Sequence, residues 1–111
     1  MPAKSDEIAR RETVAREHIR AVYGTLDDEF GATLFVSHHL DEIEAAYWTK
    51  QLATSKPEPM QVLNMLVLRS HWGGDDEIER FDFALPDEIT SYVICVAFND
   101  SGDVANISME S

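Results

Sequence analysis

The chain has little cysteine, few basic residues and no long apolar run. Cys95 is the single cysteine among 111 residues, so neither an internal disulfide nor a two-cysteine metal motif is available. No apolar run reaches the roughly 18 residues of a membrane-spanning helix, so no membrane partner is predicted. The first residues lack the apolar stretch of a signal peptide, and we therefore expect a cytoplasmic protein.

Positive charge is scarce and unevenly distributed. Nine lysines and arginines stand against 21 acidic residues, which gives a net charge of −12. Residues 1–20 hold five basic and four acidic side chains, whereas residues 21–111 hold four basic and 17 acidic ones. Such a body repels phosphate backbones, so we expect no nucleic-acid partner, and it attracts basic proteins or cations. The simpler interpretation is a solvated acidic exterior that keeps the protein soluble.

Recognisable catalytic motifs are also missing. The chain contains no HExxH zinc pattern, nucleophile elbow, phosphate-binding glycine loop or dinucleotide fingerprint. The segment 99–103 is rich in Asn, Asp and Gly, but it lacks the ligand spacing and closing Glu of an EF-hand calcium loop. We therefore predict no cofactor and assign no catalytic residue.

Three helices are predicted before residue 73. The first covers residues 6–23, with Ser5 as N-cap and Gly24 as C-terminal stop. Its apolar stripe comprises Ile8, Ala15, Ile19, Val22 and Leu26, and its solvent side comprises Arg10, Arg11, Glu12, Arg16, Glu17 and Arg20. Residues 25–36 are ambiguous, with a short strand at 33–36 as one interpretation. A second helix follows from Ser37 to about residue 52.

The third predicted helix covers residues 56–72. Ser55 and Glu58 have the spacing of a capping box, and Pro57 suits a first helical turn. The apolar run 62–68 is compatible with a strand as well as with a buried helix, because short apolar runs carry no decisive period. The capping box and the length of the pattern favour the helix.

Three strands in meander order are predicted at the C-terminal end. Residues 81–85 alternate between apolar and polar side chains, and residues 92–98 are apolar on both faces. Gly102 suits a three-residue bulged loop, which places Ile107 opposite Cys95; a four-residue loop places Ile107 opposite Ile94. Turn chemistry favours the bulged form. The sequence thus predicts one α+β domain over residues 1–111, with residues 1–5 flexible and three helices packed on a three-stranded antiparallel sheet.

Two clusters combine histidine with carboxylates and aromatic rings. His38, His39 and Glu42 share a helix face at i, i+3 and i, i+4 spacing, and two such ligands are too few for a metal without help from elsewhere. The candidate pocket residues are His38, His39, Glu42, Trp48, His71, Trp72, Asp75 and Asp76. The structural alternatives are capping or solvent-facing histidines, a His71 that interacts with a helix dipole, and tryptophans at the edge of the core.

Several short segments resemble a bacterial family of short acidic proteins that is catalogued as a domain of unknown function. The resemblance rests on residues 35–40, Tyr47-Trp48, residues 67–72, 81–83 and 92–96, and on the ending Ile107-Ser108-Met109-Glu110-Ser111. It covers roughly residues 28–111, and the C-terminal ending is its most specific part. The resemblance implies an intracellular α+β domain and brings no activity, cofactor or catalytic residue.

Three hypotheses for the function follow. The first is a non-enzymatic protein-binding or regulatory module whose acidic surface, around residues 41–44, 75–79 and 87–88, meets a basic partner. An immunity- or antitoxin-like protein that occludes a basic toxin is one example. The second is a small metal- or His/carboxylate-dependent enzyme, which requires His38, His39, His71 and Asp75 to converge. The third is a homodimerisation module that uses the doubly apolar hairpin.

Overall fold

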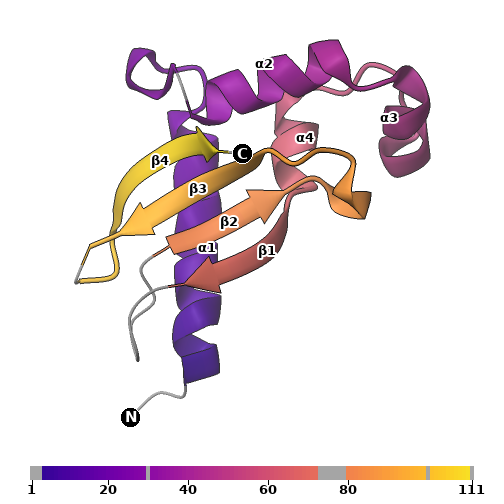
Figure 1. The fold of residues 1–111 in the computed structure, drawn as a ribbon. Helices are drawn as coiled ribbons and strands as arrows, with labels where there is room; N and C mark the ends of the chain where they lie inside the picture. The colour runs from indigo at the N-terminus through magenta and orange to yellow at the C-terminus, as the bar shows by residue number, and fades with distance from the viewer. Residues whose placement is uncertain (1–3, 30, 73–79, 100, 111) are drawn as a thin grey trace.

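The computed structural model describes residues 4–29, 31–72, 80–99 and 101–110. Within these ranges four α-helices precede a four-stranded antiparallel sheet (Figure 1). The helices are α1 (Lys4–Val22), α2 (Ala32–Glu42), α3 (Ala45–Leu52) and α4 (Pro59–Asn64). The strands are β1 (Val67–Trp72), β2 (Arg80–Ala84), β3 (Val93–Phe98) and β4 (Val104–Glu110), and two 3-10 helices are η1 (Leu26–Asp28) and η2 (Pro86–Glu88). The α+β class is confirmed, but the predicted three helices and three strands are each one too few.

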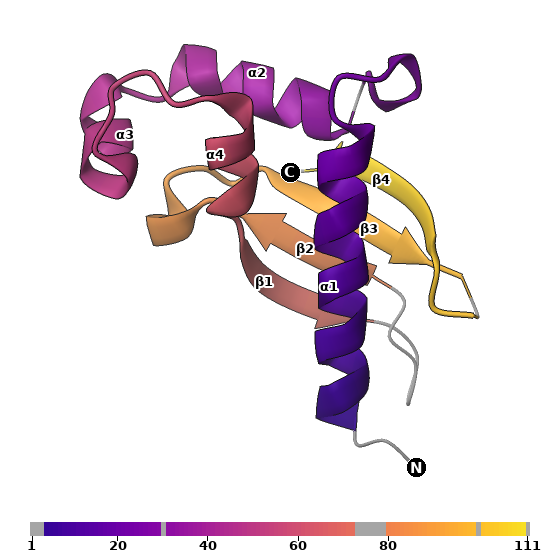
Figure 2. The same ribbon diagram turned by 180° about the vertical axis from the view of Figure 1, so that it is seen from behind.

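The sheet is a simple meander in the order β1-β2-β3-β4. α1 crosses one of its faces (Figure 2), and α2 packs against β4 and β3. Phe81, Phe83, Ile94 and Val96 point to this helix-covered face and are completely buried. Figure 1 looks onto the opposite face, which no helix of the described chain covers. The apolar core therefore lies between one sheet face and the helices.

α1 is the predicted first helix, but it begins at Lys4, so Ser5 lies inside the helix, and the predictions of Ser5 as N-cap and of residues 4 and 5 as flexible are wrong. Its arginines also do not all face solvent. Ala15 and Ile19 are buried as expected. The guanidinium of Arg11 lies 5.4 Å from the ring centroid of Phe98, and that of Arg16 lies 5.0 Å from the ring centroid of Phe83. Two predicted solvent-side arginines are thus part of the packing on the sheet, because long side chains lay their apolar stems on aromatic surface while the charged end keeps polar partners.

α1 ends before Leu26, which was predicted to belong to the apolar stripe of this helix. Gly24 adopts a φ of 82°, which ends the helical path, and Leu26 follows in η1 with 96% of its surface exposed. Asp28 then caps α2: its carboxylate accepts the backbone N–H groups of Ala32 at 3.2 Å and Thr33 at 2.8 Å. Residues 33–36 are therefore helical, and their interpretation as a strand is wrong, because a buried cap upstream starts the helix before Ser37.

The predicted second and third helices are both divided. The second breaks at Ile43, whose backbone is extended, into α2 and α3. The third ends at Asn64, and residues 67–72 form β1 instead. Its N-terminus is also displaced, since Pro59 takes the first helical position and the Gln61 side chain accepts the Glu58 N–H at 2.8 Å. The strand prevails over residues 67–72 because pairing with β2 satisfies the backbone while placing Leu68 beside Phe83.

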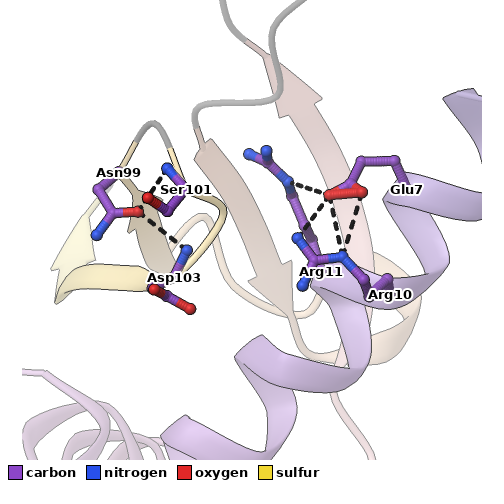
Figure 3. Close-up of polar contacts among 6 residues, drawn as sticks. All are labelled: Glu7, Arg10, Arg11, Asn99, Ser101 and Asp103. Atoms are coloured by element: carbon purple, nitrogen blue, oxygen red, sulfur yellow. Dashed lines mark hydrogen bonds and ion pairs between the residues drawn. The ribbon is translucent and has the colours of Figure 1, made fainter.

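The hairpin turn has the predicted chemistry, but the register is shifted by one residue. Gly102 has a φ of 84°, and the Asn99 side chain accepts the N–H groups of Ser101 and Asp103 (Figure 3). A bulge lies between the Phe98–Val104 pair and the Ala97–Asn106 pair, and it therefore places Ile107 opposite Val96. Both predicted pairings for Ile107 are wrong, because the bulge adds a residue to β4 that turn chemistry alone does not reveal.

Candidate functional site

His38 and His39 lie near the end of α2, beside the segment that leads into β3. Their rings form an edge contact with centroids 5.0 Å apart, and the Tyr92 ring lies 5.1 Å from His38 and 5.9 Å from His39. His39 is 1% exposed, and His38 is half-buried. Glu42 is exposed at the end of the same helix. The sequence-predicted pair is therefore brought to a tyrosine that sequence reasoning did not place in the site.

Both ring nitrogens of His39 are already engaged. A carbonyl can only accept, so the contact of 2.7 Å to the Phe35 carbonyl assigns the proton to Nδ1. Nε2 then accepts from the Thr90 hydroxyl at 3.1 Å, and Thr90 Oγ1 in turn accepts the Tyr92 N–H at 3.2 Å. This chain ties α2 to the start of β3 and leaves neither nitrogen for a substrate or metal.

The electrostatic setting of His39 agrees with a neutral, structural imidazole. Burial lowers its pKa below the usual 6.5, the contact with the Phe35 carbonyl raises it, and the neighbouring His38 lowers it further. A general base needs a pKa near the working pH and access to a substrate. His39 lacks the access.

The other candidate residues that the structure describes do not join the two histidines. His71 is exposed in β1, the edge strand opposite β4, and its ring lies 6.0 Å from that of Phe81. Trp72 ends β1. Trp48 is 2% exposed in α3, and its indole N–H has no hydrogen-bond partner in the described chain. Asp75 and Asp76 lie outside the described residues.

Metal binding finds no support among the described side chains. They contain no group of three or more His, Cys, Asp or Glu residues arranged to hold an ion. His38 and Glu42 alone would offer too few ligands for a structural zinc site.

A hollow that sequence reasoning did not anticipate lies on the open face of the sheet. Its volume is about 680 Å³, and it is lined by Arg69, Ser70, Arg80, Asp82, Ser91, Val93, Cys95 and Glu110. The register explains the lining, because Ser70, Asp82 and Cys95 occupy one row across β1, β2 and β3. Val93 and Cys95 form a buried floor, while Arg69, Arg80 and Glu110 are exposed.

Cys95 is not a nucleophile in this hollow. Burial raises the pKa of its thiol to about 11, and the charge of Asp82 and a hydrogen bond to its carboxylate contribute in the same direction, with Arg80 opposing them. A reactive cysteine needs a depressed pKa in an electropositive setting. The position of Cys95 between Ile94 and Val96 in an apolar run predicts a buried side chain, and its burial is confirmed.

A second notable surface is acidic. We call the exposed carboxylates of Asp41, Glu42, Glu44, Asp87 and Glu88 the acidic surface. Residues 75–79, which the sequence also predicted to belong to it, lie outside the described residues. α3 connects its two parts: the Tyr47 hydroxyl donates to the Pro86 carbonyl at 2.9 Å, and the Gln51 amide donates to the Asp87 carboxylate at 2.6 Å. Burial, with a smaller effect from the charge of Asp87, raises the pKa of Tyr47 to about 12.

The carboxylates of the acidic surface lack cationic partners in the described part of the chain. The ion pairs formed there join residues of α1, namely Glu7 with Arg10 and Arg11, and Glu12 with Arg16. Asp87 and Glu88 also hold positive φ angles of 65° and 51°, a conformation that costs non-glycine residues stability. The negative charge of this surface is thus left for solvent or for another molecule.

Comparisons with protein-family models, curated proteins and solved structures found no match to this chain. The resemblance to a family of unknown function therefore stays a prediction. Among the described residues, no helix has the length and apolarity to cross a bilayer.

Proposed function

We propose that this protein is a non-enzymatic protein-binding module whose acidic surface receives a basic partner. The observation that carries the proposal is the set of five exposed carboxylates that α3 joins into one region without ion-pairing to described residues. Opposite charges on a partner would accelerate the encounter and select against acidic competitors. An immunity-like role, in which the module occludes a basic toxin, is one form of this function.

The engaged state of His39 supports a binding role over a catalytic one. In the described chain, the buried imidazole uses both nitrogens internally, and the thiol of Cys95 is held protonated by burial. Neither group is free to act as base or nucleophile at neutral pH.

The test is affinity capture from native lysate with the wild-type protein and two variants of equal charge. The first variant neutralises the acidic surface through Asp41→Asn, Glu42→Gln, Glu44→Gln, Asp87→Asn and Glu88→Gln. The matched control neutralises five exposed carboxylates elsewhere through Asp6→Asn, Glu17→Gln, Asp27→Asn, Glu29→Gln and Asp103→Asn.

We expect the wild type and the control to retain the same basic protein, and the first variant to lose it. Retention should weaken as salt shortens the Debye length from about 10 Å at 0.1 M. Capture of nothing at low and moderate salt, or equal capture by both variants, would contradict the proposal.

A further inference from the structure

The described residues that line the hollow on the open face carry equal numbers of positive and negative charges, although the protein as a whole is strongly acidic. The hollow is lined by two arginines, Arg69 and Arg80, and by two carboxylates, Asp82 and Glu110. Only four basic residues follow position 20 in the sequence, and two of them line this hollow. Its charges therefore cancel, while the whole chain carries −12.

Charge also restricts where two copies of this chain can meet. Across the acidic surface, two copies would oppose like charges, which costs several kcal/mol when such charges are brought together. Across the open face, the arginines of one copy can lie opposite the carboxylates of the other. A two-fold axis generates each such pair twice. If an arginine of the first copy contacts a carboxylate of the second, the same arginine of the second copy contacts the same carboxylate of the first.

We propose that the open face of the sheet binds a second copy of this chain in a two-fold symmetric dimer. Small side chains form the floor at Val93 and Cys95, and long ones stand at the margin at Arg69 and Glu110. When the two sheets are offset, the long side chains of Arg69 and Glu110 in one copy enter the hollow of the other. Val67, which pairs with Ala84 on the same face and is 44% exposed, adds apolar area at the edge.

The size of the face sets the expected strength. Four strands spaced about 4.8 Å apart and some six residues long give a projected area of about 400 Å² per copy. This is well below the roughly 800 Å² per partner of standard interfaces, so the dimer belongs to the weak, reversible class. We expect dissociation in the micromolar range.

The experiment is sedimentation equilibrium of the full chain between about 1 and 100 µM, a range that brackets a micromolar dissociation constant. Arg69→Glu makes the face acidic, and Glu110→Arg makes it basic; both residues are exposed, so neither change disturbs the core. Lys50→Glu and Asp27→Arg, at exposed positions on α3 and η1, reproduce the same charge changes away from the face.

We expect the wild type and both controls to dimerise. Arg69→Glu and Glu110→Arg should each weaken the dimer at least about tenfold, as the loss of interfacial charge pairs does. An equimolar mixture of the two should restore it, which also shows that both variants are folded. A monomeric wild type over this range overturns the proposal, and so does a dimer that survives both reversals or a mixture that stays monomeric.

Discussion

The guanidinium of Arg16 lies over the ring of Phe83, 5.0 Å from its centroid, while its Nη1 donates to the Leu66 carbonyl at 2.8 Å. One side chain of α1 thus contacts β2 and the segment between α4 and β1 together. Glu12 completes the arrangement by accepting from Arg16 Nε at 2.9 Å. The helix is held on the sheet by this arginine as well as by Ala15 and Ile19.

Replacing Arg16 with lysine should destabilise the protein although the charge is kept. An ammonium group cannot stack on Phe83 and reach Leu66 and Glu12 at once, so we expect a loss of about 1–2 kcal/mol in the free energy of unfolding. Urea titration followed by circular dichroism measures it. Arg20→Lys is the matched control, because Arg20 makes one hydrogen bond of 3.5 Å; equal losses in both variants would contradict the assigned role of Arg16.

Acidification should weaken the fold through His39. Its pKa is depressed in the folded state by burial, so the unfolded chain binds the proton more readily. The stability contributed by the neutral ring is therefore fully present above the ordinary pKa of 6.5 and is lost as pH falls from 6.5 through the folded value. Chemical unfolding at a series of pH values reports this.

The variants for this pH series are His39→Gln and His38→Gln. His39→Gln should be less stable at neutral pH and should show a flatter pH profile, because the titrating ring is gone. His38→Gln should keep most of the wild-type slope, because the charge of His38 is the smallest of the three influences on the pKa of His39. A wild-type slope in His39→Gln would show that another group is responsible.

Gly31 should tolerate no β-carbon. A Cβ there would meet the Asp28 carboxylate, which three hydrogen bonds to Ala32 and Thr33 hold in place, and would lie 3.1 Å from the Ile107 carbonyl. We expect Gly31→Ala to cost roughly 2 kcal/mol or more through this overpacking. Thermal and urea unfolding provide the measurement.

Gly24→Ala is the control for this substitution. Gly24 has open space around its α-carbon and a φ of 82°, so alanine there meets only the left-handed backbone penalty of roughly 1 kcal/mol. If Gly31→Ala destabilises the protein less than Gly24→Ala does, the close approach of η1 to β4 does not restrict the side chain at position 31.

The Cys95 thiol should react slowly with disulfide reagents in the native protein. With a pKa of about 11, only roughly a thousandth of it is thiolate at pH 8, and the side chain is buried. In denaturant, which exposes the thiol of Cys95, the reaction should become fast. A Ser101→Cys variant supplies an exposed thiol in the β3–β4 turn as a positive control; equal native rates for both thiols would contradict the burial of Cys95.

The sequence determined those features that depend on local chemistry. The period of residues 6–23 predicted α1, the β-branched and aromatic residues of 93–98 predicted β3, and Gly102 predicted the left-handed turn. The position of Cys95 within an apolar run also predicted a buried thiol. These predictions needed only the few residues on either side of each position.

The tertiary structure alone decided the rest, because it depended on contacts between distant residues. Residues 67–72 became a strand through pairing with β2, and α2 begins at Ala32 because Asp28 is buried beneath it. His39 is fixed by Thr90, 51 positions away, and the hollow exists because register places Ser70, Asp82 and Cys95 in one row. A pattern within one segment cannot reveal which side chains another segment will bring to it. Burial and hydrogen bonding depend on those tertiary contacts.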